Sequence, residues 1–147
     1  MTQKATLSEN RVLVVDDDAS TTLLLKQVLE TENYQVDTAN SAAVAMSLIN
    51  KQKYHVVITD IMMPDKDGLA LLEDLRKRDP LIQVVIMTGG VSMSRTLSAL
   101  EHGAADFILK PINVEELIMI VRLCAAKLER WRGILRASAH QQSAAKA

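Results

Sequence analysis

Five short runs of apolar, mostly β-branched residues recur along the chain, separated by stretches in which apolar residues follow helical spacing. We expect strands at residues 11–15, 34–38, 55–59, 83–88 and 106–109. Strands that are apolar almost throughout are typical of a sheet that is covered on both faces. Because these runs alternate with helices through short connections, the pattern predicts an α/β fold with a mostly parallel sheet and right-handed crossovers.

Helices are expected between the strands, and capping residues indicate where they begin. Ser20 is a candidate N-cap of the first helix, whose apolar positions recur at helical spacing up to Asn33. The second helix is expected to begin at Ser41, and two more at about residues 69–77 and 92–102. Asp67 lies near the end of a turn-rich loop with the sequence MMPDKDG and is placed to begin the helix after it.

Composition limits the class of protein. The 147 residues are 48% apolar and 24% charged, which is typical of one soluble folded domain. A net charge of -1 without basic runs gives no reason to expect direct binding to nucleic acid. Cys124 is the only cysteine, the first residues lack the apolar core of a signal peptide, and no apolar run approaches the ~20 residues of a membrane span. We expect a cytoplasmic protein without membrane insertion.

Acidic residues follow two of the expected strands. Asp16 and Asp17 come directly after the first strand, and Asp60 follows the third. In a parallel sheet, ligands bind outside the carboxyl ends of the strands, so these side chains would meet if the two strands are neighbours. Clustered carboxylates repel each other unless a cation compensates them, and a hard ion such as Mg²⁺ suits them. The alternative is a solvated turn before a helix, where acidic residues are also common.

A lysine and a threonine end two other strands. Lys110 follows the fifth strand and precedes Pro111, which favours an extended conformation at Lys110. Its ammonium group, placed near the acidic cluster, would hold a phosphoryl or carboxylate oxygen. Thr88 ends the fourth strand before two glycines and could donate its hydroxyl to a bound oxygen, although threonine is also an ordinary strand residue.

Four segments in the order VLVVDDD, VVITDIMMPDKDG, VVIMTGG and ADFILKP carry these residues. With them the chain resembles the receiver domains of bacterial two-component response regulators, over about residues 11–128. The resemblance implies a flavodoxin-like, doubly wound (βα)5 three-layer sandwich with strand order 2-1-3-4-5, to which we expect this chain to add an extended C-terminal helix. We therefore expect a receiver domain at residues 11–128, preceded by an N-terminal segment at residues 1–10 and followed by a helix extension with a flexible tail at 129–147.

The resemblance assigns a role to each residue of the expected site. Asp60 would be the phosphoacceptor and become a phosphoaspartate, while Asp16 and Asp17 would bind Mg²⁺ together with Asp60. The backbone carbonyl of Met62 would be a further metal ligand. Thr88 and Lys110 would contact the phosphoryl group during the transfer.

A switch is the function that the resemblance implies, rather than a turnover enzyme. A sensor histidine kinase or a phosphotransfer protein would donate the phosphoryl group. Thr88 and Phe107 would then move, which remodels the face of the fourth helix, fifth strand and fifth helix for a downstream target protein or a missing output domain. Met62 borders the expected path of the hydrolytic water, so the lifetime of the phosphoryl group stays open.

Two other functions are compatible with parts of the pattern. A phosphohydrolase of the haloacid-dehalogenase type also attacks with aspartate beside Mg²⁺, but that family has a second aspartate two residues later, where this chain has Met62. A flavodoxin-like interaction module that takes no phosphate is the other alternative. The complete set of acidic, hydroxyl and lysine residues argues against it.

The last helix is longer than a receiver domain needs. Asn113 and Glu116 form a pair of the capping-box type at its start. Apolar residues then alternate in steps of four and three, as in a coiled-coil seam, at Leu117, Val121, Cys124, Leu128, Trp131 and Leu135. We expect the domain core to use this stripe up to Leu128. Beyond it the helix could form a homodimer, lead into an output domain, or fray, and residues 137–147 are expected to be a disordered tail or a linker.

Overall fold

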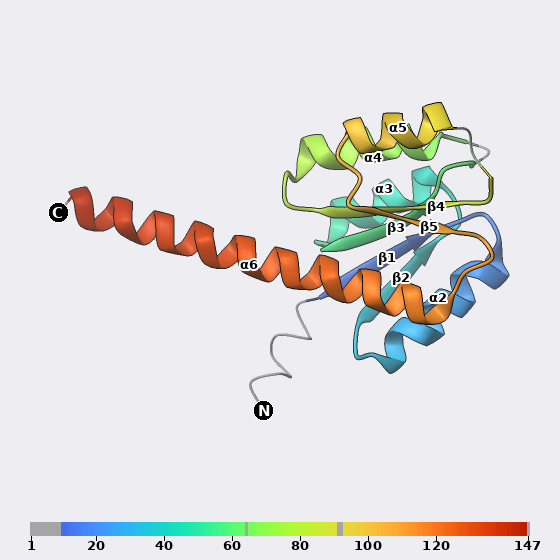
Figure 1. Ribbon diagram of the computed structural model, residues 1–147, viewed down its shortest axis with the longest axis horizontal. Helices are drawn as coiled ribbons and strands as arrows, with labels where there is room; N and C mark the ends of the chain where they lie inside the picture. Colours follow the sequence, from blue (N-terminus) through green and yellow to red (C-terminus); the bar gives the residue numbers. More distant parts are fainter. Residues whose placement is uncertain (1–9, 64, 91–92, 147) are drawn as a thin grey trace.

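Five parallel strands form one sheet in the order β2-β1-β3-β4-β5 (Figure 1), in a computed structural model that describes residues 10–63, 65–90 and 93–146. The strands are β1 (Arg11–Val15), β2 (Gln35–Ala39), β3 (Val56–Asp60), β4 (Gln83–Thr88) and β5 (Asp106–Leu109). The predicted flavodoxin-like order is therefore confirmed. Except for Asn10, the expected N-terminal segment lies outside the described residues, and so do Pro64, Ser92 and Ala147.

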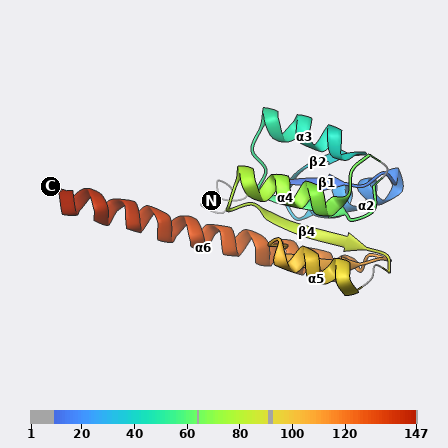
Figure 2. The ribbon, with the colours of Figure 1, turned by 90° about the horizontal axis from the view of Figure 1, so that it is seen from above.

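Helices cover both faces of this sheet, which gives the predicted three layers (Figures 1 and 2). The helices are α2 (Ala19–Thr31), α3 (Ala42–Lys51), α4 (Gly68–Arg78), α5 (Met93–Glu101) and α6 (Val114–Lys146). One apolar cluster joins the sheet to α2 and α6, and a second cluster joins the opposite face to α3, α4 and α5. Alternate residues of each strand feed the two clusters, as in β1, where Val12 and Val14 belong to the first and Leu13 and Val15 to the second.

The register of the central strands brings the polar strand ends together. β1 pairs with β3 so that Val15 lies opposite Thr59, and β3 pairs with β4 so that Asp60 lies opposite Met87. β5 lies next to β4, with Leu109 opposite Thr88. The residues directly after these positions therefore share one edge of the sheet.

Several expected boundaries need correction. Asp18, not Ser20, caps α2, because Asp18 has extended backbone angles and its carboxylate accepts hydrogen bonds from the amide and hydroxyl of Ser20. α2 ends at Thr31, and Asn33 adopts the left-handed conformation that turns the chain into β2. β2 and β3 each begin and end one residue later than expected. Asp67 does cap α4, where its side chain accepts from the amide of Leu69.

α6 leaves the sheet and continues as a straight helix beyond the globular part (Figures 1 and 2). Its start is capped as predicted, with Asn113 Oδ1 accepting from the amide of Glu116 at 3.0 Å. Leu128 is the last buried residue of the stripe, while Ile134 and Leu135 are about half exposed. Residues 137–146, expected to be a disordered tail or a linker, are instead helical, because α6 extends through Lys146, and their role as a linker stays a prediction. Several alanines in this segment favour helix, and an existing helix propagates at low cost.

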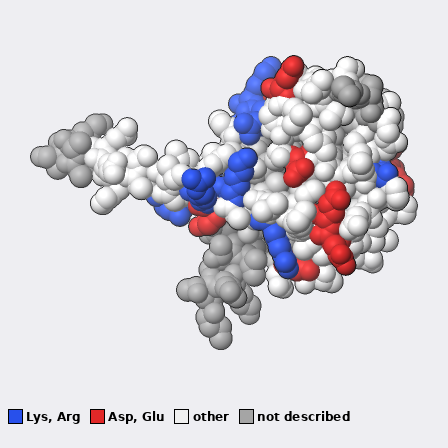
Figure 3. All heavy atoms as spheres, viewed as in Figure 1, with Lys and Arg blue, Asp and Glu red and all other residues white. Residues whose placement is uncertain are grey.

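Charged side chains are unevenly distributed on α6. Figure 3 shows Lys and Arg side chains gathered where the helix leaves the globular part.

Among the described residues, no helix combines the length and the apolar character that crossing a membrane requires.

Candidate functional site

Three carboxylates meet at the carboxyl edge of the sheet, as the sequence predicted. Asp16 and Asp17 follow β1 and Asp60 ends β3, and each offers an oxygen within 4.8 Å of the others. Asp16 and Asp60 are almost fully buried, with 1% and 8% of their surface exposed, whereas Asp17 is exposed. A set of carboxylate oxygens that is open to solvent on one side suits a hard divalent ion that keeps part of its water shell.

Lys110 enters this cluster from the end of β5. Its Nζ atom lies 2.8 Å from Asp16 Oδ2 and 2.8 Å from Asp60 Oδ2. Partial burial lowers the pKa of the ammonium group, but the hydrogen bonds and negative charges of Asp16 and Asp60 outweigh it, so the pKa is raised above its usual value. Three carboxylates and one ammonium group leave a formal charge of -2 (3 × -1 plus +1), which one divalent cation would neutralise.

Backbone amides fix the orientation of both buried carboxylates. Asp16 Oδ1 accepts from the amide of Asp18 at 2.9 Å, and Asp60 Oδ1 accepts from the amide of Met62 at 3.1 Å. Each carboxylate is thus held by a backbone amide at one oxygen and by Lys110 at the other. This leaves the Asp60 side chain with little rotational freedom at the mouth of the site.

The loop after β3 closes tightly on itself through Gly68. The amide of Gly68 donates to the carbonyl of Ile61 at 2.9 Å. A Cβ atom at Gly68 would lie 2.4 Å from the backbone oxygen of Asp60, so only glycine fits there. Met62 lies in this loop with its side chain 60% exposed. The expected role of the Met62 carbonyl as a metal ligand stays a prediction.

Thr88 and Lys110 are tied together through the backbone. The amide of Lys110 donates to the carbonyl of Thr88 at 2.8 Å, and the Lys110–Pro111 peptide bond is cis. Thr88 is buried at the end of β4, beside the acidic cluster in the sheet. Phe107 is partly buried against the second apolar cluster. The structure thus brings Asp16, Asp17, Asp60 and Lys110 together, while the roles of Thr88 and Phe107 as switch residues stay predictions.

Two residues near the site were not singled out from the sequence. The Asp65 carboxylate accepts from the amides of Ala42 and Ala43 at 3.2 and 3.0 Å, and these bonds lower its pKa. Arg95 of α5 pairs with Asp67 and contacts Met62. Local sequence gave no signal for either, because each contact joins segments more than 20 residues apart.

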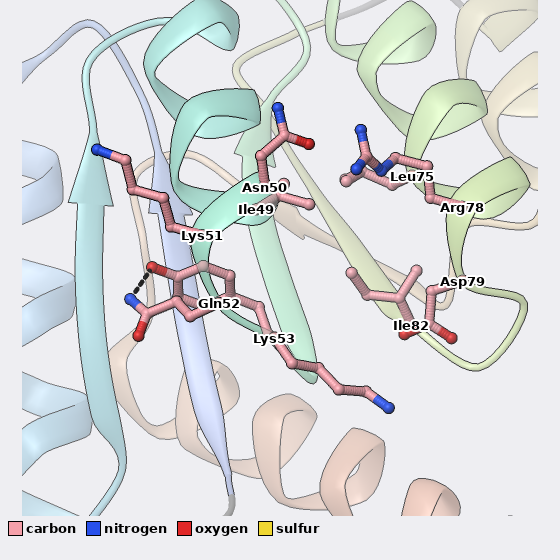
Figure 4. Close-up of a pocket in the computed structure, with 10 residues that line it drawn as sticks. Ile49, Asn50, Lys51, Gln52, Lys53, Leu75, Arg78, Asp79 and Ile82 are labelled. Carbon is pink, nitrogen blue, oxygen red and sulfur yellow. Dashed lines mark hydrogen bonds between the residues drawn. The ribbon is translucent and has the colours of Figure 1, made fainter.

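A separate hollow of about 440 Å³ lies between the C-terminal ends of α3 and α4 (Figure 4). Its polar lining includes Lys51, Lys53 and Arg78, and its apolar lining includes Leu75 and Ile82. Lys51 and Arg78 belong to the last turns of their helices, where basic side chains stabilise the helix dipole. This explains the basic residues without a ligand, so we assign no site to the hollow.

The remaining candidate residues have structural roles. His55 is buried and its Nδ1 atom accepts from the amide of Arg11 at 3.0 Å. Cys124 is buried in the first cluster, and burial raises the pKa of its thiol to about 11, as expected for an inert core cysteine.

Comparison with known proteins decides which family has this arrangement. The sequence model of one protein family, the response regulator receiver domain, matches residues 12–122, which include the whole acidic cluster and Lys110. The chain belongs to this family. Receiver domains of two-component systems are phosphoacceptor switches rather than turnover enzymes, and they bind Mg²⁺ at an acidic pocket.

Solved receiver domains have the same fold. A CheY-like receiver domain protein from Methanospirillum hungatei is 31% identical to this chain, with a TM-score of 0.80. The matched region covers 82% of this chain and 97% of the Methanospirillum chain. The receiver domain of NtrC4, solved as a beryllofluoride-activated dimer, is 33% identical with a TM-score of 0.77. The matched region covers 80% of this chain and 98% of the NtrC4 chain.

Curated relatives are longer than this chain. The alginate biosynthesis transcriptional regulatory protein AlgB of Pseudomonas syringae pv. tomato is 33% identical over 140 residues, which cover 91% of this chain and 31% of AlgB. The transcriptional regulatory protein TrcR of Mycobacterium tuberculosis is 35% identical over 130 residues, 88% of this chain and 47% of TrcR. The chain thus spans less than half of either relative. Because both are named transcriptional regulators, the expectation of no direct nucleic-acid binding has no support.

Proposed function

We propose that this receiver domain accepts a phosphoryl group on Asp60, from a sensor histidine kinase or a phosphotransfer protein, in a Mg²⁺-dependent reaction. The observation that carries the proposal is the contact of Lys110 with both Asp16 and Asp60 at 2.8 Å. A lysine held between two buried carboxylates at a strand edge is the arrangement that a transferring phosphoryl group needs, because charge neutralisation and positioning supply most of the catalysis.

The transfer follows from the chemistry of the residues present. A carboxylate oxygen of Asp60 forms a bond to phosphorus, while the bond from phosphorus to the donor imidazole nitrogen breaks and its electron pair stays with the imidazole. Lys110, already within hydrogen-bond distance of Asp60, then donates to a phosphoryl oxygen. Asp16, Asp17, Asp60 and the carbonyl of Met62 would hold a Mg²⁺ ion, which would supply further positive charge. Thr88 donates its hydroxyl to the same group.

The new charge is proposed to act on the face made by α5, β5 and α6. Thr88 moves toward the phosphoryl group and the Phe107 ring, which lacks a hydroxyl, turns inward and couples the change through packing alone. Several large apolar side chains on these elements are about half exposed or more, which suits binding to a downstream protein or an output domain: Leu97, Leu100, Leu109, Met119 and Leu123. Hydrolysis of the phosphoaspartate by water resets the switch in a cytoplasmic signalling cycle.

The projecting part of α6 is the proposed connection to an output domain or to a second copy of the chain. Ile134 and Leu135 are exposed there without a cover from the described part of the domain. Pairing with α6 of a second copy would bury them, and so would contact with an output domain, as the longer relatives AlgB and TrcR allow.

Phosphorylation with a small donor tests the proposal directly. We would incubate the protein with acetyl phosphate and Mg²⁺ and measure the intact mass, and titrate beryllofluoride in parallel. The wild type is expected to gain one phosphoryl group, and Asp60→Asn to gain none. Asp74→Asn is the matched control, because Asp74 is a partly exposed aspartate that pairs with Lys66 and does not belong to the acidic cluster. A wild type that stays unmodified and binds no beryllofluoride would sink the proposal.

A further inference from the structure

α5 is only weakly held by apolar packing. Among the α5 residues whose side chains are described, Ala99 alone is buried, and Leu97 and Leu100 are about half exposed. One buried alanine contributes far less to binding a helix than the buried leucines of α4 do. Among the described side chains of α5, polar contacts therefore contribute a large part of what positions the helix.

Two polar side-chain contacts tie α5 and its C-terminal end to α4. His102, directly after α5, lies 2.6 Å from Glu73 of α4. At the other end of α5, the guanidinium group of Arg95 pairs with Asp67, the N-cap of α4. The same guanidinium group lies 3.4 Å from the sulfur of Met62. Arg95 thus bridges the N-terminal end of α5 to the loop after the phosphoacceptor.

Short contacts connect this loop to Asp60 itself. The amide of Met62 donates to Asp60 Oδ1, and Gly68, next to Asp67, packs against the Asp60 backbone. Both loop residues that Arg95 contacts are therefore fixed relative to Asp60. A change in charge at Asp60 therefore lies close to the loop residues that Arg95 contacts.

We propose that Arg95 is a positioning residue that holds α5 in its unphosphorylated arrangement through Asp67 and Met62. The inference rests on the proposed phosphorylation of Asp60. A phosphoryl group adds close to two negative charges beside the loop, and these compete with Asp67 for the guanidinium group. The contact that holds the N-terminal end of α5 near the loop after β3 is then weakened. In a two-state switch, such a contact stabilises the inactive state and so lowers the apparent affinity of every ligand that binds the active state.

Removing the bridge should therefore make activation easier. We expect Arg95→Gln to bind beryllofluoride, in the presence of Mg²⁺, about two- to fivefold more tightly than the wild type, as the loss of a partly exposed ion pair implies. Asp67→Asn should have the same effect, because asparagine keeps the acceptor that caps α4 at Leu69. Arg95→Lys keeps the charge and should restore most of the wild-type affinity.

A double-mutant cycle of Arg95→Gln and Asp67→Asn tests this, with the beryllofluoride affinity of each protein measured by calorimetry. Hydrogen exchange of the amides of α5 is measured in the same intact proteins. The inference is supported if the double variant binds beryllofluoride no more tightly than either single variant. It also requires that the amides of α5 exchange faster in the unphosphorylated variants than in the unphosphorylated wild type. Lys66→Gln is the matched control, because it breaks the ion pair that Lys66 of this loop makes with Asp74 of α4, and its affinity for beryllofluoride should stay unchanged. Unchanged, weaker or additive affinities in the Arg95 and Asp67 variants overturn the inference while the proposed function stands. A wild type that binds no beryllofluoride overturns both.

Discussion

The ammonium nitrogen of Lys110 lies 2.8 Å from Asp60 Oδ2, although 50 residues separate them in the chain. The same nitrogen lies 2.8 Å from Asp16, so one lysine serves as counter-ion for two largely buried carboxylates. A divalent ion brought to the cluster would share these carboxylates with Lys110. Binding of the metal would therefore be thermodynamically linked to Lys110 through Asp16 and Asp60.

Replacing Lys110 tests this linkage. We expect Lys110→Met to lower the free energy of unfolding by about 1 to 3 kcal/mol without Mg²⁺, because each buried carboxylate loses a hydrogen-bond partner and the two lose their shared counter-ion. Millimolar Mg²⁺ should recover part of that loss, so the metal should stabilise the variant more than the wild type. Urea unfolding with and without Mg²⁺ measures both. As a control, Lys66→Met removes a partly exposed ion pair and should cost at most about 1 kcal/mol. Equal stabilisation of both proteins by Mg²⁺ would contradict the linkage.

Gly68 gives a second prediction, about the loop that orients Asp60. A Cβ atom at Gly68 would lie 2.4 Å from the backbone carbonyl oxygen of Asp60 and 2.8 Å from the Cα atom of Ile61. Gly68→Ala must therefore displace the backbone. We expect a loss of about 1 to 3 kcal/mol in urea unfolding. Gly133→Ala is the matched control, because its new Cβ meets nothing within 4 Å and alanine favours helix by about 1 kcal/mol. A Gly68→Ala protein as stable as the wild type would show that the loop adjusts freely.

The sheet and the acidic cluster could be predicted because both depend on local patterns. Apolar runs and helical spacing are properties of short segments, and the residues that end parallel strands share an edge once the strand order is known. The order itself came from the resemblance, and the register of β1 with β3 confirms it. Asp16, Asp17, Asp60 and Lys110 could therefore be grouped from sequence.

Contacts that depend on tertiary structure could not be predicted. Asp18 and Ser20 are both good N-cap residues, and only the backbone angles of Asp18 decide between them. The bond from the amide of Ala43 to Asp65 and the pairing of Arg95 with Asp67 join separate loops and helices, whose approach depends on packing. The helical end of α6 was missed because its small polar composition is also typical of linkers.

His55 gives a prediction about pH. Burial lowers the pKa of this imidazole from its usual 6.5 to about 4, and the charges of Arg132, Lys53 and Arg11 contribute to the lowering while Asp79 opposes it. The folded state therefore favours neutral His55, whose Nδ1 atom accepts from the Arg11 amide. The stabilisation is complete above pH 6.5 and is lost as the pH falls through about 4, amounting to about 3 kcal/mol.

Urea unfolding between a pH of about 7.5 and about 4.5 measures this loss. His55→Gln keeps an acceptor for the Arg11 amide but cannot titrate, so its stability should change less over this range. Arg132→Ala, on α6, should raise the pKa of His55, as followed by NMR of the imidazole. Parallel pH profiles of the wild type and His55→Gln would exclude His55 as the source.

The last prediction concerns self-association through α6. Its projecting part exposes Ile134 and Leu135 and carries more basic than acidic side chains. If two copies pair through this stripe in parallel, their basic residues approach each other, so association should strengthen as salt screens the repulsion. Light scattering should then show a mass between monomer and dimer that rises with ionic strength and falls to the monomer in Ile134→Glu and Leu135→Glu. Truncation after Leu128, the last buried residue of the stripe, should have the same effect with little change in stability. A mass that is unchanged by truncation and by salt would exclude pairing through this helix.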